Sequence, residues 1–239
     1  MITSVMIDHA RTGQDNMAID ERLIHSPGTL RLYTWKPWCI SLGRHQNETV
    51  IDDKTRHQRG WDVVRRPTGG RAVLHADEIT YAVALPLTGS IRASDVYEYV
   101  HQVLVTALKE FVPELTFTTA PTTLPHHYAT AGAVAASCFT SKARTEIVFG
   151  QQKVVGSAQR IIDHTVLQHG SILVGPGHLE LANVLALSEV ERAVLINNLR
   201  QSSISLTEIL NHHVDVDEAL QKVATDISSN LHIPLEFAV

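Results

Sequence analysis

Apolar residues recur along the chain with two different periods, which separate the predicted helices from the predicted strands. The clearest helix is predicted at 94–111, because its apolar residues recur every three or four positions. Asp15 is a suitable N-cap for an earlier helix. The further stretches with a helical pattern are 15–24, 52–59, 179–187, 205–212 and 216–231.

Shorter apolar runs that are bounded by turn residues predict the strands. Thr68-Gly69-Gly70 is expected to turn after one strand, and Gly150-Gln151 and Asp163-His164 to separate three consecutive strands. The predicted strands are 29–35, 38–42, 62–66, 79–87, 115–119, 144–149, 153–161, 165–174 and 235–239. Residues 29–35 and 38–42 would be connected through Lys36-Pro37.

The order of these elements predicts an α+β fold. Strands dominate the front and middle of the chain and helices gather late, which favours a largely antiparallel or mixed sheet flanked by helices. No break in composition divides the chain, so a single domain over residues 1–239 is expected. Residues 120–136 have no clear period and are interpreted as a long loop, a kind of segment that often carries function.

Composition narrows the class of protein. The chain has 239 residues, of which 44% are hydrophobic and 19% charged, as expected for a globular domain. A formal net charge of −5 argues against a nucleic-acid-binding protein. No secretory segment and no apolar run long enough to cross a membrane is visible, so a cytoplasmic protein is expected. Its two cysteines, Cys39 and Cys138, are then expected to be reduced.

The first stretch with candidate chemistry runs from Arg65 to His75, with the sequence RRPTGGRAVLH. Adjacent glycines, here Gly69 and Gly70, allow a backbone to approach a ligand closely, and their N–H groups can serve an anion or a carbonyl oxygen. Gly-Gly is equally typical of an ordinary turn, and spacing alone favours that interpretation. Neither common phosphate-binding glycine motif is present.

The second stretch contains a cysteine and a lysine that are 15 residues apart, Cys138 and Lys153. A thiol reacts as the thiolate, and a neighbouring ammonium group lowers its pKa. The small residues Gly156-Ser157-Ala158 follow Lys153 and are typical of close approach to a ligand within a strand. Without further context, a solvated lysine and a buried cysteine are the more common outcomes.

The third stretch is Gln168-His169-Gly170-Ser171, a polar interruption of an apolar strand. A buried histidine bonded to the backbone and a site residue are about equally good interpretations. No metal site is expected, because the pairs His126-His127 and His212-His213 lack the helical spacing of a zinc site. A serine hydrolase is disfavoured, since the chain has no Gly-x-Ser-x-Gly elbow.

Taken together and in order, these stretches resemble the lipoate–protein ligase and biotin–protein ligase superfamily. The greatest resemblance is to its cysteine-dependent octanoyltransferases, in RRPTGGR-x-VLH, in Cys138-Phe139 followed by Lys153 and Gly156-Ser157-Ala158-Gln159, and in QHGSIL from Gln168. The resemblance extends from about Asn16 to Val174. It implies the catalytic-domain fold of that superfamily.

The resemblance also implies a reaction and a site. Cys138 would take an octanoyl group from octanoyl-acyl carrier protein as a thioester, assisted by Lys153. A lysine of a lipoyl-domain protein, such as the glycine-cleavage H protein, would then accept it without ATP or any cofactor. The implied substrate-binding residues are Arg66, Gly69, Gly70, Arg71, His75, Gly156, Ser157, Ala158, His169 and Gly170. The acyl chain is expected along Val73-Leu74 and residues 79–83.

Two departures from the family pattern leave alternatives open. Ala76 stands where an acidic residue commonly follows the motif histidine, so any role of that acid falls to Asp77 or Glu78. The chain also ends, at Val239, short of the expected C-terminal helical tail. An ATP-dependent lipoate ligase and a catalytically silent acyl- or lipoyl-domain-binding module are therefore retained as alternative functions.

Overall fold

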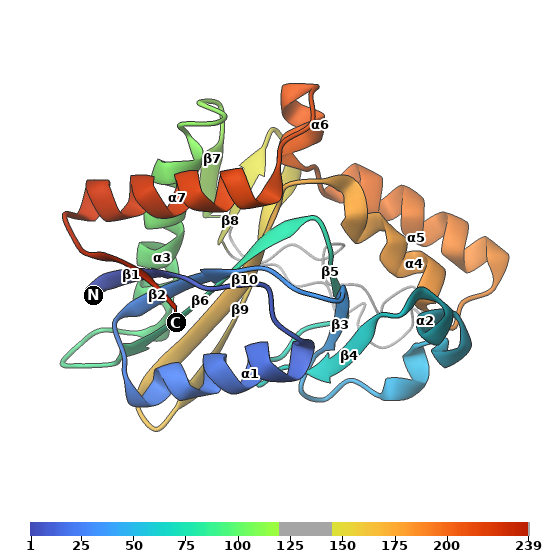
Figure 1. The fold of residues 1–239 in the computed structure, drawn as a ribbon, viewed down its shortest axis with the longest axis horizontal. Helices are drawn as coiled ribbons and strands as arrows, with labels where there is room; N and C mark the ends of the chain where they lie inside the picture. The colour runs from blue at the N-terminus through green and yellow to red at the C-terminus, as the bar shows by residue number, and fades with distance from the viewer. Residues whose placement is uncertain (120–144, 239) are drawn as a thin grey trace.

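The computed structural model describes residues 1–119 and 145–238, which form one large sheet, one small sheet and the surrounding helices (Figure 1). The large sheet has the strand order β11-β1-β2-β6-β10-β9-β8-β7, and the small one β4-β3-β5. The strands are β1 (Ser4–Ile7), β2 (Thr29–Tyr33), β3 (Cys39–Leu42), β4 (Asp62–Arg65), β5 (Val73–His75), β6 (Glu78–Pro86), β7 (Thr116–Thr119), β8 (Thr145–Phe149), β9 (Gln152–Ile162), β10 (Thr165–Leu173) and β11 (Leu235–Phe237).

Helices cover both sheets. The α-helices are α1 (Gly13–Arg22), α2 (Asp53–Arg59), α3 (Ala93–Leu108), α4 (Leu181–Val184), α5 (Glu189–Ser202), α6 (Leu206–Leu210) and α7 (Val216–Leu231). Short 3-10 helices occupy Leu23–His25, Glu48–Val50 and Pro176–Glu180. The longest helix on the N-terminal side, α3, begins where Arg92 and Asp95 bond each other reciprocally, and α7 begins where the Asp215 carboxylate accepts two backbone N–H groups.

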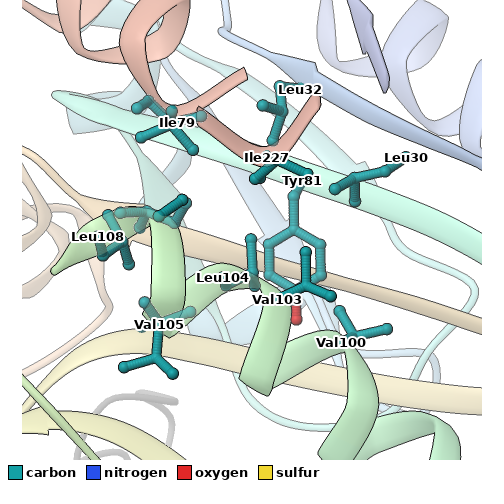
Figure 2. Packing of buried hydrophobic residues seen from close by; sticks show 14 of the residues in the cluster. Leu30, Leu32, Ile79, Tyr81, Val100, Val103, Leu104, Val105, Leu108 and Ile227 are labelled. Atoms are coloured by element: carbon teal, nitrogen blue, oxygen red, sulfur yellow. The ribbon is translucent and has the colours of Figure 1, made fainter. Parts of the chain in front are cut away.

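The main core lies between one face of the large sheet and the helices α3 and α7. In β6, alternate residues face this core, with Ile79, Tyr81 and Val83 among them. Figure 2 shows the Tyr81 ring between Leu30 of β2 and Leu104 of α3, with Ile227 of α7 close by. This packing leaves the intervening residues of β6 on the opposite face, toward the small sheet.

A second layer covers that opposite face. Met17 of α1 and Leu23 pack with Tyr33, Trp35, Leu167 of β10 and small residues of β6. Ala82 and Ala84 are among those small residues, and their short side chains let the layer approach closely. The small sheet continues this layer and has its own core against α4 and α5, built around Ile40, Leu74 and Leu195.

The expected fold class is confirmed. The strands from β2 to β7 in the sheet order pair antiparallel, whereas β1 pairs parallel to both β2 and β11. The predicted hairpin between β9 and β10 is also present, with its turn at Asp163 and His164. Both residues have positive φ, at 47° and 63°, as the tight turn of a hairpin requires.

Other expectations about elements were wrong. The predicted helix at 179–187 is a 3-10 turn followed by the short α4, because Leu185 leaves the helix to form a β-bridge with Ile51. Helix α5 and strand β1 were not predicted. In α5, the buried Leu195 and Leu199 share the helix with an exposed Val190, so the sequence lacks a single clean apolar stripe.

No helix among the described residues is both long and apolar enough to cross a lipid bilayer.

Candidate active site

A pocket lies between the large sheet and the small sheet, and both sheets contribute to its wall. Its lining is part apolar and part ionisable, consisting of Met17, Tyr33, Trp35, Ser41, Arg66, Val73, His75, Thr80, Glu146, Lys153, Gly156, Ser157, Ala158, His169, Gly170 and Ser171. Such a mixture, an apolar surface with a few convergent polar groups, is typical of small-molecule sites.

The structure brings together most of the residues singled out in the sequence. Eight of the predicted site residues line the pocket, namely Arg66, His75, Lys153, Gly156, Ser157, Ala158, His169 and Gly170. Gly69, Gly70 and Arg71 form the adjoining turn and do not line the pocket. Cys138, the expected nucleophile, lies outside the described residues, as do the predicted loop at 120–136 and Val239.

Lys153 is held by a carboxylate in the pocket wall. Its Nζ lies 2.7 Å from Oε1 of Glu146, and both residues are buried. Glu146 belongs to β8 and Lys153 to the neighbouring β9, where a bulge shifts the register between Ile147 and Val148. The pairing offsets much of the cost of burying either charge alone. It also holds the ammonium group at one position in the pocket wall.

The C-terminal helical segment secures the backbone at the same point. Lys153 forms a β-bridge with Ser203, and its carbonyl accepts a hydrogen bond from the N–H of Ile204 at 3.0 Å. The side-chain amide of Gln152 donates to the carbonyls of Arg200 and Ser203. The start of β9 is therefore fixed both by its sheet neighbour and by the end of α5.

Arg66 organises the glycine turn. Its guanidinium donates to the carbonyls of Ser41, Gly69 and Arg71, at distances between 2.7 and 3.2 Å. The turn also needs close backbone approach, because a Cβ on Gly43 would lie 1.9 Å from the carbonyl oxygen of Gly70. Arg66 thus fixes the turn from inside while one edge of its side chain faces the pocket.

His75 lies in a chain of hydrogen bonds that the sequence did not reveal. Its Nδ1 is 2.7 Å from Oε1 of Glu78, and its Nε2 is 2.7 Å from the hydroxyl of Ser41. Of the two acidic residues considered from the sequence, Glu78 is the one that contacts His75. Asp77 instead accepts from the backbone of Gly177, outside the pocket lining, and burial raises its pKa.

His169 is joined to a buried charge network behind the pocket. Its Nδ1 lies 3.2 Å from Asp20, and its Nε2 lies 2.6 Å from the hydroxyl of Thr68. Asp20 in turn pairs with Arg31 at 2.8 Å. Burial lowers the pKa of His169, so the ring is neutral at pH 7. It therefore donates from Nδ1 to Asp20 and accepts from Thr68, which connects α1 to the glycine turn.

Ser157 joins the pocket to the main core. The Tyr81 hydroxyl donates to Ser157 at 2.7 Å, and Ser157 lies 3.0 Å from Nε2 of His101. Nδ1 of His101 donates to the carbonyl of Tyr97, so Nε2 is the acceptor for Ser157. Burial lowers the pKa of His101 to about 4 and raises that of Tyr81 to about 12, so both are neutral at pH 7.

Comparison with known proteins agrees with this geometry. The sequence model of the lipoyl protein ligase A/B catalytic domain matches residues 12–228. The chain belongs to this family.

Among curated relatives, octanoyltransferase LipM of Moorella thermoacetica is 38% identical over 84% of this chain and 76% of the relative. Octanoyltransferase LipM of Bacillus subtilis is 30% identical over 92% of this chain and 83% of the relative. The names of these relatives agree with the octanoyltransferase expected from the motifs.

Solved structures support the same fold. A bipartite lipoate protein ligase from Thermoplasma acidophilum superposes with a TM-score of 0.74 at 20% identity, covering 100% of this chain and 88% of the other. A lipoate-protein ligase A bound with ATP gives a TM-score of 0.72 at 19% identity, covering 100% of this chain and 90% of the other. The fold expected from the resemblance is thus confirmed.

Three residues of this lipoyl protein ligase family member surround the site but were not assigned to it from the sequence. These are Asp20, Ser41 and Glu146. Asp20 and Ser41 lie in stretches that the family resemblance includes, but no pattern singled them out. Glu146 lies in a predicted strand, where a polar residue is ordinarily read as solvent-facing.

The predicted acyl lining was wrong in part: Val73 and Thr80 face the pocket, whereas Leu74, Ile79 and Val83 are buried in the two cores.

Proposed function

We propose that this protein is an octanoyltransferase that moves an octanoyl group from acyl carrier protein, through a cysteine thioester, to a lysine of a lipoyl-domain protein. The observation that carries the proposal is the similarity to curated octanoyltransferases over most of both chains. The pocket supports it, because it combines an apolar wall with a buried lysine.

In the first half of the reaction, the Cys138 thiolate attacks the carbonyl carbon of the donor thioester. A new C–S bond forms to Cys138, and the old C–S bond breaks to release the carrier thiolate. Lys153 has two roles in this proposal: its positive charge favours the thiolate of Cys138, and it stabilises the negative charge that develops on the carbonyl oxygen. Glu146 keeps the ammonium group at one place between turnovers.

The octanoyl chain lies along the apolar part of the wall, against Met17, Trp35 and Val73. Ala158 and Gly170 leave room beside it, since neither carries a bulky side chain. The acyl head lies toward Arg66, His75 and the adjoining turn of Gly69, Gly70 and Arg71. Gly156, Ser157 and His169 complete the wall on the large-sheet side.

In the second half, a lysine amine of a lipoyl-domain protein, such as the glycine-cleavage H protein, attacks the acyl-enzyme. A C–N bond forms, the C–S bond to Cys138 breaks, and the proton of the ammonium intermediate returns to the thiolate. An amide lies below a thioester in free energy, so this transfer needs no ATP.

The test is intact-protein mass spectrometry after mixing the chain with octanoyl-acyl carrier protein in the absence of ATP. We expect the wild type to gain one octanoyl group and the Cys138→Ala variant to gain none. Adding H protein should then discharge the acyl group onto it. ATP-driven octanoylation or lipoylation that survives Cys138→Ala would instead identify a ligase. Binding of the carrier with no covalent adduct would identify a silent binding module.

A second measurement tests Lys153. Iodoacetamide alkylation of Cys138, followed against pH, reports the pKa of that thiol. We expect Lys153→Ala to shift the alkylation profile to higher pH and to slow acylation at pH 7. Superimposable profiles in the two proteins would remove Lys153 from the thiol-activating role.

A further inference from the structure

Three buried side chains form a continuous hydrogen-bonded chain that opens onto the pocket. The Ser41 hydroxyl lies 2.7 Å from Nε2 of His75, and Nδ1 of His75 lies 2.7 Å from Oε1 of Glu78. Ser41 comes from β3, His75 from β5 and Glu78 from β6. Ser41 and His75 both line the pocket, and Glu78 lies behind them, 1% exposed.

The donors and acceptors follow one order from Ser41 through His75 to Glu78. Oε1 of Glu78 accepts from the Thr80 hydroxyl, so it also acts as the acceptor for Nδ1 of His75. The Ser41 hydroxyl oxygen accepts from Arg66, so its proton points to Nε2 of His75. The His75 ring is held by stacking on Trp35, with ring centres 4.1 Å apart and planes inclined by 13°. The Trp35 indole donates to Thr80, which donates to the same oxygen of Glu78. The ring and the carboxylate are therefore both held in place.

The geometry meets the requirements for an activated serine. The nucleophile is within hydrogen-bonding reach of the base, and a third group orients that base. A guanidinium adds to this, because Nη1 of Arg66 donates to the Ser41 hydroxyl oxygen at 3.1 Å and favours negative charge there. The other oxygen of Glu78 is buried and has no hydrogen-bond partner among the described residues.

We propose that Ser41, His75 and Glu78 form a second nucleophilic site, which hydrolyses medium-chain acyl esters and thioesters independently of Cys138. The assignment of acyl compounds as substrates rests on the proposed function of the pocket. The assignment of Ser41 as the nucleophile rests on the geometry of the three residues alone. Ser41 lines the pocket but has no water-accessible surface, so a substrate in the pocket reaches its hydroxyl only when the side chains that cover it shift.

In the reaction, the Ser41 oxygen attacks the acyl carbonyl carbon while its proton passes to Nε2 of His75. A C–O bond forms to Ser41, the bond to the leaving thiol or alcohol breaks, and His75 returns the proton to that leaving group. Water then attacks the acyl-serine ester with His75 as base again. The products are the fatty acid and free Ser41, so no cofactor or external reductant is consumed.

The experiment uses the full chain with Cys138→Ala, so that the thiol contributes nothing. An alkyl fluorophosphonate reacts with activated serines by forming an O–P bond and releasing fluoride. We expect it to label one serine, which peptide mass spectrometry maps to Ser41. Hydrolysis of p-nitrophenyl octanoate should be measurable in the same background, and Glu78→Gln or His75→Gln should slow it at least about 100-fold.

A matched control is available elsewhere in the chain. Ser203 is also buried and also hydrogen-bonded to a histidine, with its hydroxyl 2.9 Å from Nε2 of His178, but it does not line the pocket. Ser203→Ala should therefore leave labelling and hydrolysis unchanged, while Ser41→Ala abolishes both. If Ser41→Ala fails to fold, the mapped position of the label in the Cys138→Ala protein decides.

Three results would overturn the proposal: no labelling, labelling of another serine, or hydrolysis that Glu78→Gln leaves unchanged. Ser41, His75 and Glu78 would then only support Arg66 structurally. Octanoyl transfer by the wild type is measured separately, so a failure of that function is recognised on its own. Fluorophosphonate labelling without hydrolysis of the octanoyl ester would refute the acyl class, since the site would then hold a reactive serine that does not accept this substrate.

Discussion

Gly170 is a position where one methyl group should have a large effect. It lies in β10 opposite Ser157 and Tyr81 on the two neighbouring strands. A Cβ there would lie 2.4 Å from the carbonyl oxygen of Gly156, 2.7 Å from Cε1 of Tyr81 and 2.8 Å from the hydroxyl oxygen of Ser157. Two of these atoms belong to a backbone and a core ring, which cannot rotate away.

The substitution Gly170→Ala therefore overpacks the pocket wall. Overpacking of this kind costs about 1–3 kcal/mol in a well-packed interior. For a protein of this size, each kcal/mol lowers the melting temperature by roughly 2–4 °C. We expect urea unfolding and a thermal scan to report that loss. Octanoyl transfer should fall as well, because β9 must move at the residues that line the pocket.

Gly69→Ala is the matched control. A Cβ on Gly69 meets nothing within 4 Å, and its φ is not among the positive values. Stability should be unchanged or raised by up to about 1 kcal/mol, through the less flexible unfolded chain. Equal melting temperatures for Gly170→Ala and the wild type would refute the close packing of β10 against β9 and β6. A loss of transfer in Gly69→Ala without a loss of stability would support its proposed place beside the acyl head.

Three further predictions concern buried groups. Lys153→Met should lower the free energy of unfolding by about 3–5 kcal/mol, and adding Glu146→Gln should recover part of it, because the single change removes the ammonium group with which the buried Glu146 carboxylate pairs. Equal stability of the single and double variants in urea would contradict this. Burial raises the pKa of the Cys39 thiol well above its usual range, so native Cys138→Ala protein should resist iodoacetamide at pH 8 and take up one label only after denaturation. Burial also lowers the pKa of His101 from 6.5 to about 4, so the unfolded chain binds the proton first as the pH falls. Stability should therefore be lost between about pH 6.5 and pH 4, by on the order of 3 kcal/mol from this group, and urea midpoints at pH 7 and pH 4.5 should differ less in His101→Gln.

Local signals in the sequence predicted the parts of the fold that depend on local chemistry. The turn at Asp163-His164 follows from two residues between apolar runs, and α3 follows from its regular apolar stripe. Helix α5 escaped prediction because its buried face is set by α4 and β9, which the sequence alone does not place beside it. Strand β1 is only four residues long, too short for a period to stand out.

The site shows the same division. The glycine turn, Lys153 and His169 were recognisable because each stands in an unusual local sequence. The partners of these residues were not recognisable. Asp20 is 149 positions from His169 in the chain, and the local sequence around either residue does not predict the contact. Ser41 is 34 positions from His75, and a polar residue at its place in a short strand is ordinary. Long-range pairs of this kind become visible only when the strands are aligned.

The pairing of the first strand with the last has a consequence for biosynthesis. β1 lies between β2 and β11 in the large sheet. Residues 235–237 are synthesised after the other described strands, so one hydrogen-bonding edge of β1 stays open until β11 has been made. An open edge is a template for pairing with another chain. The nascent protein would therefore depend on β11, or on a chaperone until β11 has been made, to keep the sheet from extending into a neighbour.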